Sequence, residues 1–225
     1  MLMAVFCLGA SLIGINAQEK DWANLQRYAQ QNAELPKPDK NEKRVVFMGN
    51  SITEGWVNTH PDFFKSNGYI GRGIGGQTSY QFLVRFREDV INLSPALVVI
   101  NAATNDIAEN TGAYHEDRTF GNIVSMVELA KANHIKVILT TTLPAAAFGW
   151  NPAIKDAPQK IQSLNARIEA YAKANKIPFV NYYQPMVVGE NKALNPQYTK
   201  DGVHPTGEGY EVMETLIKQA IEKAL

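Results

Sequence analysis

Cysteine is almost absent from this sequence, since Cys7 is the only one in 225 residues. It lies in residues 1–17, an uncharged apolar stretch that is too short to span a membrane and ends at Ala17. These features predict a secretory signal peptide cleaved after Ala17 and a secreted or periplasmic protein. The bulky Phe6 before Cys7 argues against a lipoprotein signal. The mature chain would contain no cysteine, which excludes disulfides, thiol catalysis and cysteine-bound metals.

An excess of charge of either sign is also missing, because 22 Lys and Arg residues balance 22 Asp and Glu residues. Nucleic-acid-binding domains usually carry a basic patch, so no nucleic-acid partner is predicted. No apolar run is long enough to predict a membrane span. The composition, 45% hydrophobic and 20% charged, is typical of a globular protein. Without an internal repeat or a linker, residues 18–225 are predicted to form a single domain.

The sequence does contain an alternation of apolar runs and helical patterns. The central runs are almost wholly apolar, which indicates strands buried on both faces and hence a parallel sheet covered by helices on each side. The chain is therefore predicted to adopt an α/β fold. Predicted strands occupy residues 44–48, 95–100, 135–143 and 177–182, predicted helices occupy residues 19–32, 78–93, 119–133, 158–175 and 207–225, and residues 184–201 are predicted to be irregular.

The first predicted strand ends in Gly49-Asn50-Ser51, a pattern typical of a strand that turns into a helix at the sheet edge. A serine at the carboxyl end of a parallel strand lies where open α/β sheets bind their ligands. Ser51 is therefore a candidate nucleophile, and the alternative is an ordinary serine at a helix N-terminus. Segments around Gly76 and Asn105 also follow predicted strands, so we expect them at the same edge.

Asp201 and His204 provide the groups that would activate a serine. Their spacing lets the carboxylate accept a hydrogen bond from one imidazole nitrogen, while the other nitrogen acts as a base on Ser51. The oxyanion formed on attack of an ester needs hydrogen-bond donors. The candidates are the backbone N–H groups of Ser51 and Gly76 and the side-chain amide of Asn105.

These blocks resemble those of the SGNH hydrolases, also called GDSL-type esterases and lipases. The hallmark residues of that family are a Ser, a Gly, an Asn and a His in separate blocks, which Ser51, Gly76, Asn105 and His204 match in order, with Asp201 three residues before the histidine. The resemblance implies a flavodoxin-like, three-layer α/β/α sandwich with a five-stranded parallel sheet. It also implies ester hydrolysis through an acyl-serine, with a Ser-His-Asp triad, an oxyanion hole, and neither cofactor nor metal.

Two positions depart from the family pattern. Asn50 stands beside the nucleophile where the family usually has Asp, and Ala103 stands where Gly is usual. Neither is one of the four hallmark residues. The departures keep a second hypothesis open, in which the chain is a catalytically inert glycan-binding module that retains the fold.

The substrate hypothesis depends on aromatic residues in a predicted loop. Phe148 and Trp150 lie in residues 145–157, where they would either stack on a sugar ring or cover the core. Exported proteins of this form often resemble carbohydrate acetylesterases. The expected partner is therefore a small-molecule or glycan ester, with removal of O-acetyl groups from a carbohydrate as the first hypothesis. Lysophospholipid or thioester hydrolysis is the alternative within the family.

The remaining motifs predict less. Residues 71–76 also fit the G-x-G-x-x-G dinucleotide fingerprint, but they do not directly follow the first predicted strand, and a lone match is weak. His60, His115 and His134 are predicted to be surface or packing residues. No metal site is predicted.

Overall fold

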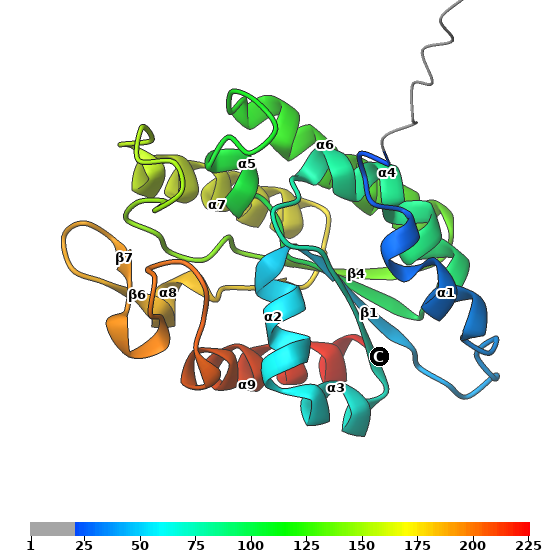
Figure 1. Ribbon diagram of the computed structural model, residues 1–225. Helices are drawn as coiled ribbons and strands as arrows, with labels where there is room; N and C mark the ends of the chain where they lie inside the picture. Colours follow the sequence, from blue (N-terminus) through cyan, green and yellow to red (C-terminus); the bar gives the residue numbers. More distant parts are fainter. Residues whose placement is uncertain (1–20) are drawn as a thin grey trace, which may run out of the picture.

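Five parallel strands form the central sheet, in the order β2-β1-β3-β4-β5 (Figure 1). The computed structural model describes residues 21–225, so the predicted signal peptide, residues 1–17, lies outside the described residues. This strand order, with helices on both faces, is that of a flavodoxin-like α/β/α sandwich and confirms the predicted fold. The strands are β1 (Val45–Gly49), β2 (Tyr69–Gly73), β3 (Leu97–Ile100), β4 (Lys136–Thr140) and β5 (Phe179–Val180).

Successive residues of a strand point to opposite faces of the sheet, and each face builds its own core. In β1, Val46 and Met48 join the core under one helical layer, whereas Val45 and Phe47 join the core under the other. The first layer contains α4 (Ser79–Asp89), α6 (Glu116–Ala132) and α7 (Ala157–Ala174). The second contains α2 (Ser51–Thr59), α3 (Pro61–Asn67) and α9 (Gly207–Ala224).

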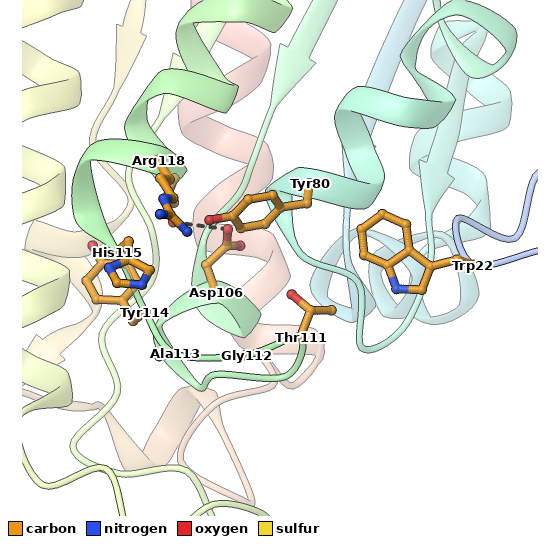
Figure 2. A pocket seen from close by; sticks show the side chains of 10 residues that line it. Trp22, Tyr80, Asp106, Thr111, Gly112, Ala113, Tyr114, His115 and Arg118 are labelled. Carbon is orange, nitrogen blue, oxygen red and sulfur yellow. Dashed lines mark hydrogen bonds between the residues drawn. The ribbon is translucent and has the colours of Figure 1, made fainter.

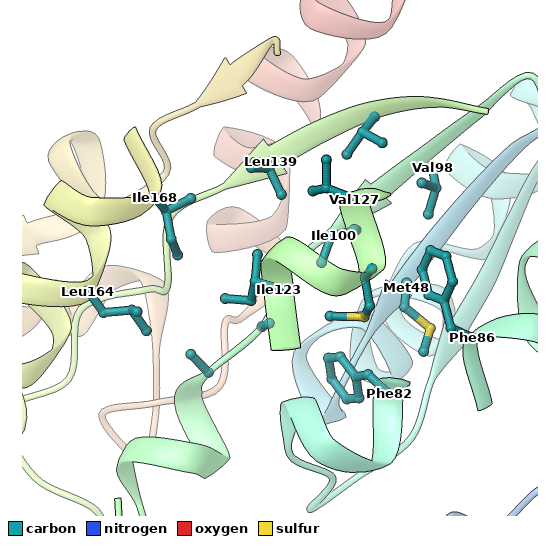
Figure 3. Close-up of a cluster of buried hydrophobic side chains, with 14 of the residues drawn as sticks. Met48, Phe82, Phe86, Val98, Ile100, Ile123, Val127, Leu139, Leu164 and Ile168 are labelled. Atoms are coloured by element: carbon teal, nitrogen blue, oxygen red, sulfur yellow. The ribbon is translucent and has the colours of Figure 1, made fainter. Parts of the chain in front are cut away.

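The core beneath α4, α6 and α7 holds the end of β1 in place (Figure 3). Phe82 and Phe86 of α4 lie beside Met48 of β1, and all three side chains are fully buried. Burial of an apolar side chain of this size stabilises the folded state by about 1.5–3 kcal/mol. The layer therefore fixes the strand that leads into Ser51.

The N-terminal helix α1 (Gln26–Glu34) is shorter than predicted. The Asp21 carboxylate accepts hydrogen bonds from the N–H groups of Leu25 and Gln26 (2.8 and 3.0 Å), and Asn24 adopts a left-handed φ of +54°. These interactions start the helix at Gln26 rather than near residue 19. Trp22 therefore lies outside the helix, with 52% of its surface exposed.

Short elements complete the chain. The helix predicted over residues 78–93 is shorter in the structure, where α4 ends at Asp89 and the 3₁₀ turn η1 (Ile91–Leu93) follows it. The helix α5 (Thr104–Ile107) follows β3. The segment predicted to be irregular, residues 184–201, overlaps α8 (Tyr183–Met186). It contains the antiparallel pair β6 (Val187–Val188) and β7 (Ala193–Leu194) and the 3₁₀ turn η2 (Pro196–Tyr198). Over residues 21–225, every helix is too short or too polar to cross a lipid bilayer.

Candidate active site

Ser51 is the first residue of α2 and directly follows the turn after β1. The Asn50 side chain caps this helix, because its Oδ1 accepts a hydrogen bond from the N–H of Ile52 (3.0 Å). Asparagine and aspartate are both good N-caps. The departure at Asn50 therefore keeps the local turn that presents Ser51.

Glycine is required where β2 approaches this turn. A Cβ on Gly73 would lie 2.2 Å from the Glu54 nitrogen and 2.6 Å from the Asn50 carbonyl oxygen. Only a residue without a side chain lets the two backbones approach so closely. The end of β2 therefore supports the Ser51 turn by direct backbone contact.

His204 joins Ser51 to Asp201. Ser51 Oγ lies 2.8 Å from His204 Nε2, and His204 Nδ1 lies 2.6 Å from Asp201 Oδ2. The other carboxylate oxygen accepts the N–H groups of Val203 (2.9 Å) and His204 (2.8 Å), which holds the carboxylate in place. With its proton on Nδ1, the neutral imidazole presents an unprotonated Nε2 to the serine hydroxyl. The structure thus brings together the three residues that the sequence predicts to meet.

The Asp201 carboxylate is held in its ionised form. Partial burial alone would raise the pKa of Asp201, but the hydrogen bond from the His204 ring and those from the N–H groups of His204 and Val203 outweigh it and lower the pKa to about 2. An unperturbed aspartate has a pKa of about 3.9. The stability that this carboxylate contributes is therefore fully present above about pH 4 and is lost as the pH falls toward 2.

We expect Asp201→Asn to lower kcat by about 10²–10³-fold, because a neutral amide cannot stabilise an imidazolium and can select the wrong imidazole tautomer. The effect should be smaller than for a buried aspartate, since 52% of the Asp201 side chain is exposed to water. The measurement is kcat and KM for p-nitrophenyl acetate, with the exposed neighbour Glu208→Gln as the control. An unchanged kcat in Asp201→Asn would remove this residue from the proposed triad.

The three predicted oxyanion donors are the N–H groups of Ser51 and Gly76 and the side-chain amide of Asn105. Gly76 adopts a φ of +75°, a conformation that favours glycine. The Asn105 amide donates to the carbonyl of Gln77 (2.9 Å), which holds it beside the Gly76 loop and leaves its second hydrogen for a ligand. Across the described part of the chain, neither the Ser51 N–H nor the Gly76 N–H has an acceptor. These groups can therefore donate to a bound molecule.

The structure explains why Ala103 is an unusual residue at its position. It precedes α5 and adopts φ +84° and ψ −16°, in the left-handed region. Glycine enters this region readily, whereas a residue with a Cβ is strained there by about 1–2 kcal/mol. The Asn105 turn nevertheless forms, with Asn105 itself 3% exposed.

Trp150 lies over the His204 ring, with the ring centroids 6.2 Å apart and 35° between the planes. Its Nε1 donates to Asn110 Oδ1 (2.9 Å), and Asn110 Nδ2 donates to the Gly76 carbonyl (3.0 Å). Asn110, which the sequence motifs did not indicate, thus connects Trp150 to the Gly76 loop. Trp150 is 47% exposed and can contact a ligand.

Of the two roles predicted for Phe148, the structure supports the core role and not the sugar-binding role. Its side chain is fully buried in the core and packs against Trp150, with the ring centroids 5.3 Å apart. Because none of it reaches the surface, Phe148 cannot stack on a sugar ring, which was the alternative role. It instead supports Trp150 from below.

Arg85, in α4, is a fully buried residue that supports the site. It donates to the Gly49 carbonyl (2.8 Å), to Gln77 Oε1 (2.6 Å) and to Asp89 Oδ2 (2.8 Å). One guanidinium therefore joins the end of β1, just before Ser51, to the residue that follows Gly76. Burial lowers the pKa of Arg85, and the hydrogen bond to the Asp89 carboxylate opposes this effect.

Asp106 anchors α5, the short helix that contains Asn105. Its carboxylate accepts hydrogen bonds from the Ser79 N–H (2.9 Å), the Ser79 hydroxyl and the Thr119 hydroxyl (3.2 Å). Burial raises the pKa of Asp106, and the bonds from Ser79 and Thr119 oppose the increase. These contacts fix α5, and with it Asn105, against the start of α4.

The other histidines and the glycine-rich motif have structural positions. His60 Nδ1 lies 2.6 Å from Glu214 Oε1, which indicates a packing role, and His134 occupies a left-handed turn position after α6. Gly71 and Gly73 lie inside β2, whereas a dinucleotide fingerprint places its glycines in the turn after a strand. In residues 21–225, no three His, Cys, Asp or Glu side chains gather as a metal site would require.

The chain matches known proteins over most of its length. The model of the GDSL-like lipase/acylhydrolase family matches residues 47–212. A candidate acylhydrolase from Bacteroides fragilis NCTC 9343 is 92% identical, with a TM-score of 0.91 over 91% of this chain and 99% of that one. A GDSL-like lipase from Bacteroides thetaiotaomicron VPI-5482 is 85% identical, with a TM-score of 0.90 over 90% of this chain and 99% of that one.

Two more distant proteins match less closely. A lipoprotein from Bacillus subtilis (strain 168) is 32% identical over 117 residues, which cover 44% of this chain and 48% of that protein. The chain thus spans about half the length of this curated relative. An acetylxylan esterase from Geobacillus stearothermophilus is 18% identical, with a TM-score of 0.61 over 80% of this chain and 94% of that one. This last likeness shows a shared fold.

Proposed function

Because the chain belongs to the GDSL-like lipase/acylhydrolase family, we propose that it is a serine esterase that hydrolyses short-chain esters through an acyl-serine intermediate. One observation carries the proposal. Ser51 Oγ lies 2.8 Å from His204 Nε2, and His204 Nδ1 lies 2.6 Å from Asp201 Oδ2. This is the arrangement that makes a serine hydroxyl nucleophilic.

In the proposed reaction, His204 Nε2 takes the hydroxyl proton as Ser51 Oγ attacks the ester carbonyl carbon. The carbonyl electron pair moves onto oxygen, and the N–H groups of Ser51 and Gly76 and the Asn105 amide donate to the oxyanion. The intermediate then collapses, and the alcohol leaves with the proton from His204. Asp201 stays ionised and stabilises the imidazolium while it exists.

Deacylation repeats these steps with water. His204 Nε2 takes a proton from a water molecule, and the resulting hydroxide attacks the acyl carbon on Ser51. When the second tetrahedral intermediate collapses, Ser51 Oγ recovers its proton from His204 and the carboxylic acid is released. No group outside the chain and the water is required.

The proposed substrate is an O-acetylated carbohydrate. The exposed indole of Trp150 lies over His204, where it can stack on the sugar ring that carries the ester. The link from Trp150 through Asn110 to the Gly76 carbonyl ties this aromatic face to the oxyanion donors. The acetylxylan esterase that shares the fold acts on an acetylated glycan, but the proposal for this chain rests on Trp150.

The proposed location is outside the cytoplasm, as a secreted or periplasmic protein with residues 18–225 as its single catalytic domain. The relative from Bacillus subtilis is a lipoprotein, and lipoproteins are exported. Mass spectrometry of the N-terminus of the exported protein tests this location. A mature chain that begins at Gln18 is the expected result.

A fluorophosphonate probe and an ester panel test the proposed reaction. The probe should label the wild type stoichiometrically at Ser51. Catalytic efficiency should be highest for acetyl esters and fall by about tenfold or more toward octanoyl esters of p-nitrophenol, and acetylated sugars should be hydrolysed. Trp150→Ala should raise KM for acetylated sugars by about five- to tenfold.

The alternative functions give different results in the same experiment. An inert glycan-binding module would bind sugars but would not be labelled by the probe. A lysophospholipase would prefer long acyl chains, and a thioesterase would prefer acyl thioesters. Any of these three results would replace the proposed activity.

A further inference from the structure

A cavity lies beside the candidate active site, and none of the residues proposed to take part in the reaction lines it. It has a volume of about 340 Å³ and is here called the Trp22 cavity. Figure 2 shows Trp22 and Tyr80 on one side, Arg118 and His115 on the other, and Asp106 between them. Its volume is near the lower end of the range for small-molecule sites, about 300–1,000 Å³, and suits a single sugar ring.

The Trp22 cavity adjoins the Gly76 loop and the turn that contains Asn105. Thr111 lines it and directly follows Asn110, whose amide binds the Gly76 carbonyl at 3.0 Å. The Thr111 hydroxyl also lies 3.1 Å from that of Thr78, two residues after Gly76. Asp106, at the centre of the cavity, directly follows Asn105. A molecule that occupied both the candidate active site and the Trp22 cavity would therefore run from Ser51 across Asn110.

The position of Trp22 is maintained by hydrogen bonds to the same block. Gln81 Nε2 donates to the Trp22 carbonyl (2.8 Å), and Gln77 Nε2 donates to the carbonyl of Ala23 (2.6 Å). The indole is nevertheless 52% exposed, although its burial would be favourable. A large aromatic side chain that is anchored by its backbone and left exposed at a cavity is suited to stack on a ligand.

The polar side chains of the Trp22 cavity have unused hydrogen-bond donors. The nearby carboxylates Glu116 and Asp117 both pair with Arg167 (3.0 and 2.8 Å). Among residues 21–225, no carboxylate forms an ion pair with Arg118. The Arg118 guanidinium and the Thr111 hydroxyl line the same cavity, and both can donate hydrogen bonds to hydroxyl groups of a sugar. An exposed indole opposite these donors provides the apolar face that the C–H side of a sugar ring needs.

We propose that the Trp22 cavity binds a further sugar unit of the substrate, so that the enzyme acts on acetylated oligosaccharides rather than on acetylated monosaccharides. The sugar stacks on Trp22 and accepts hydrogen bonds from Arg118 and Thr111, while the unit that carries the ester lies between Trp150 and Ser51. This inference rests on the proposed esterase function. It adds the minimum size of the substrate and the place where the additional unit binds.

The test compares one substrate series in several variants. KM and kcat are measured for monoacetylated mono-, di- and trisaccharides of the xylose, mannose and glucose series. In at least one series, the wild type should show a KM about tenfold lower for the trisaccharide than for the monosaccharide. Trp22→Ala should reduce this ratio to about one, and Arg118→Met should reduce it about threefold. Val84→Ala, an exposed apolar residue of α4 outside the cavity, is the control and should keep the wild-type ratio.

The outcomes separate this inference from the function on which it rests. Labelling by the fluorophosphonate probe and hydrolysis of p-nitrophenyl acetate report on the reaction at Ser51 without any sugar. If both succeed and Trp22→Ala keeps the wild-type ratio, or if no series shows a preference for the longer sugar, the cavity proposal is wrong and the esterase remains. If both fail, the esterase itself is wrong.

Discussion

Ser51→Ala is expected to lower kcat by at least about 10⁴-fold for every ester that the wild type hydrolyses. In the proposed reaction the variant lacks the Oγ atom that forms the acyl intermediate, while His204 and the proposed oxyanion donors remain in place. Residual activity above the uncatalysed rate would come from these donors acting on a water molecule. The measurement is single-turnover and steady-state kinetics with p-nitrophenyl acetate, together with fluorophosphonate labelling.

The loss in Ser51→Ala should be chemical and not structural. Ser51 is half-buried, and within residues 21–225 its hydroxyl hydrogen-bonds only to the His204 ring, so the melting temperature should stay within a few degrees of the wild type. Ser66→Ala, an exposed serine of α3, is the matched control and should keep full activity. Retention of most activity in Ser51→Ala would mean that another residue is the nucleophile.

Arg85→Met should destabilise the protein by about 3–5 kcal/mol, because it leaves the Asp89 carboxylate buried without its cation. For a chain of this length the melting temperature should fall by about 10 °C or more. The Gly49 carbonyl and Gln77 Oε1 also lose their donor, so kcat should fall about tenfold even where the variant is fully folded. Denaturant unfolding and kinetics below the transition test both effects.

Two matched variants separate the effect of Arg85 on stability from its effect on the position of the active-site residues. Arg87→Met, on the exposed face of the same helix, should change stability by less than about 0.5 kcal/mol. Arg85→Met combined with Asp89→Leu removes both buried charges and should recover part of the stability but not the lost kcat. Equal stabilities of the Arg85→Met and Arg87→Met variants would contradict the support that we assign to Arg85.

The fold was most predictable where strands are buried on both faces. β1 and β3 have no exposed residue, so their segments are apolar throughout and stand out in the sequence. β2 is an edge strand in which Gly71 and Gly73 replace apolar side chains, and its first three residues are only partly buried. Such a strand lacks the pattern that identifies the others. The two-residue strands β6 and β7 are too short to produce any pattern.

The contact between Ser51, His204 and Asp201 was predictable because parallel strands end at one edge and because the two latter residues share a turn. Arg85 was not predicted, although it lies three residues after Phe82 on the apolar face of α4, with Asp89 a further turn along. A charged pair on a buried helical face was therefore visible in the sequence. Asn110 gave no such signal, since an exposed loop asparagine has no periodic neighbours.

Ser51 and His204 are 153 positions apart along the chain. The core beneath α2 and α9 couples α2, which begins at Ser51, to α9, which follows the His204 loop, and the Tyr210 hydroxyl donates to the Ile52 carbonyl at 2.9 Å. Under the proposed chemistry, a ribosome-bound or truncated polypeptide that stops before residue 204 is unable to cleave esters. Hydrolysis consequently reports that the chain has been synthesised at least through His204 and has folded. The protein could thus be divided into two inactive fragments in a surface loop, and the return of colour from a chromogenic ester would measure their reassociation.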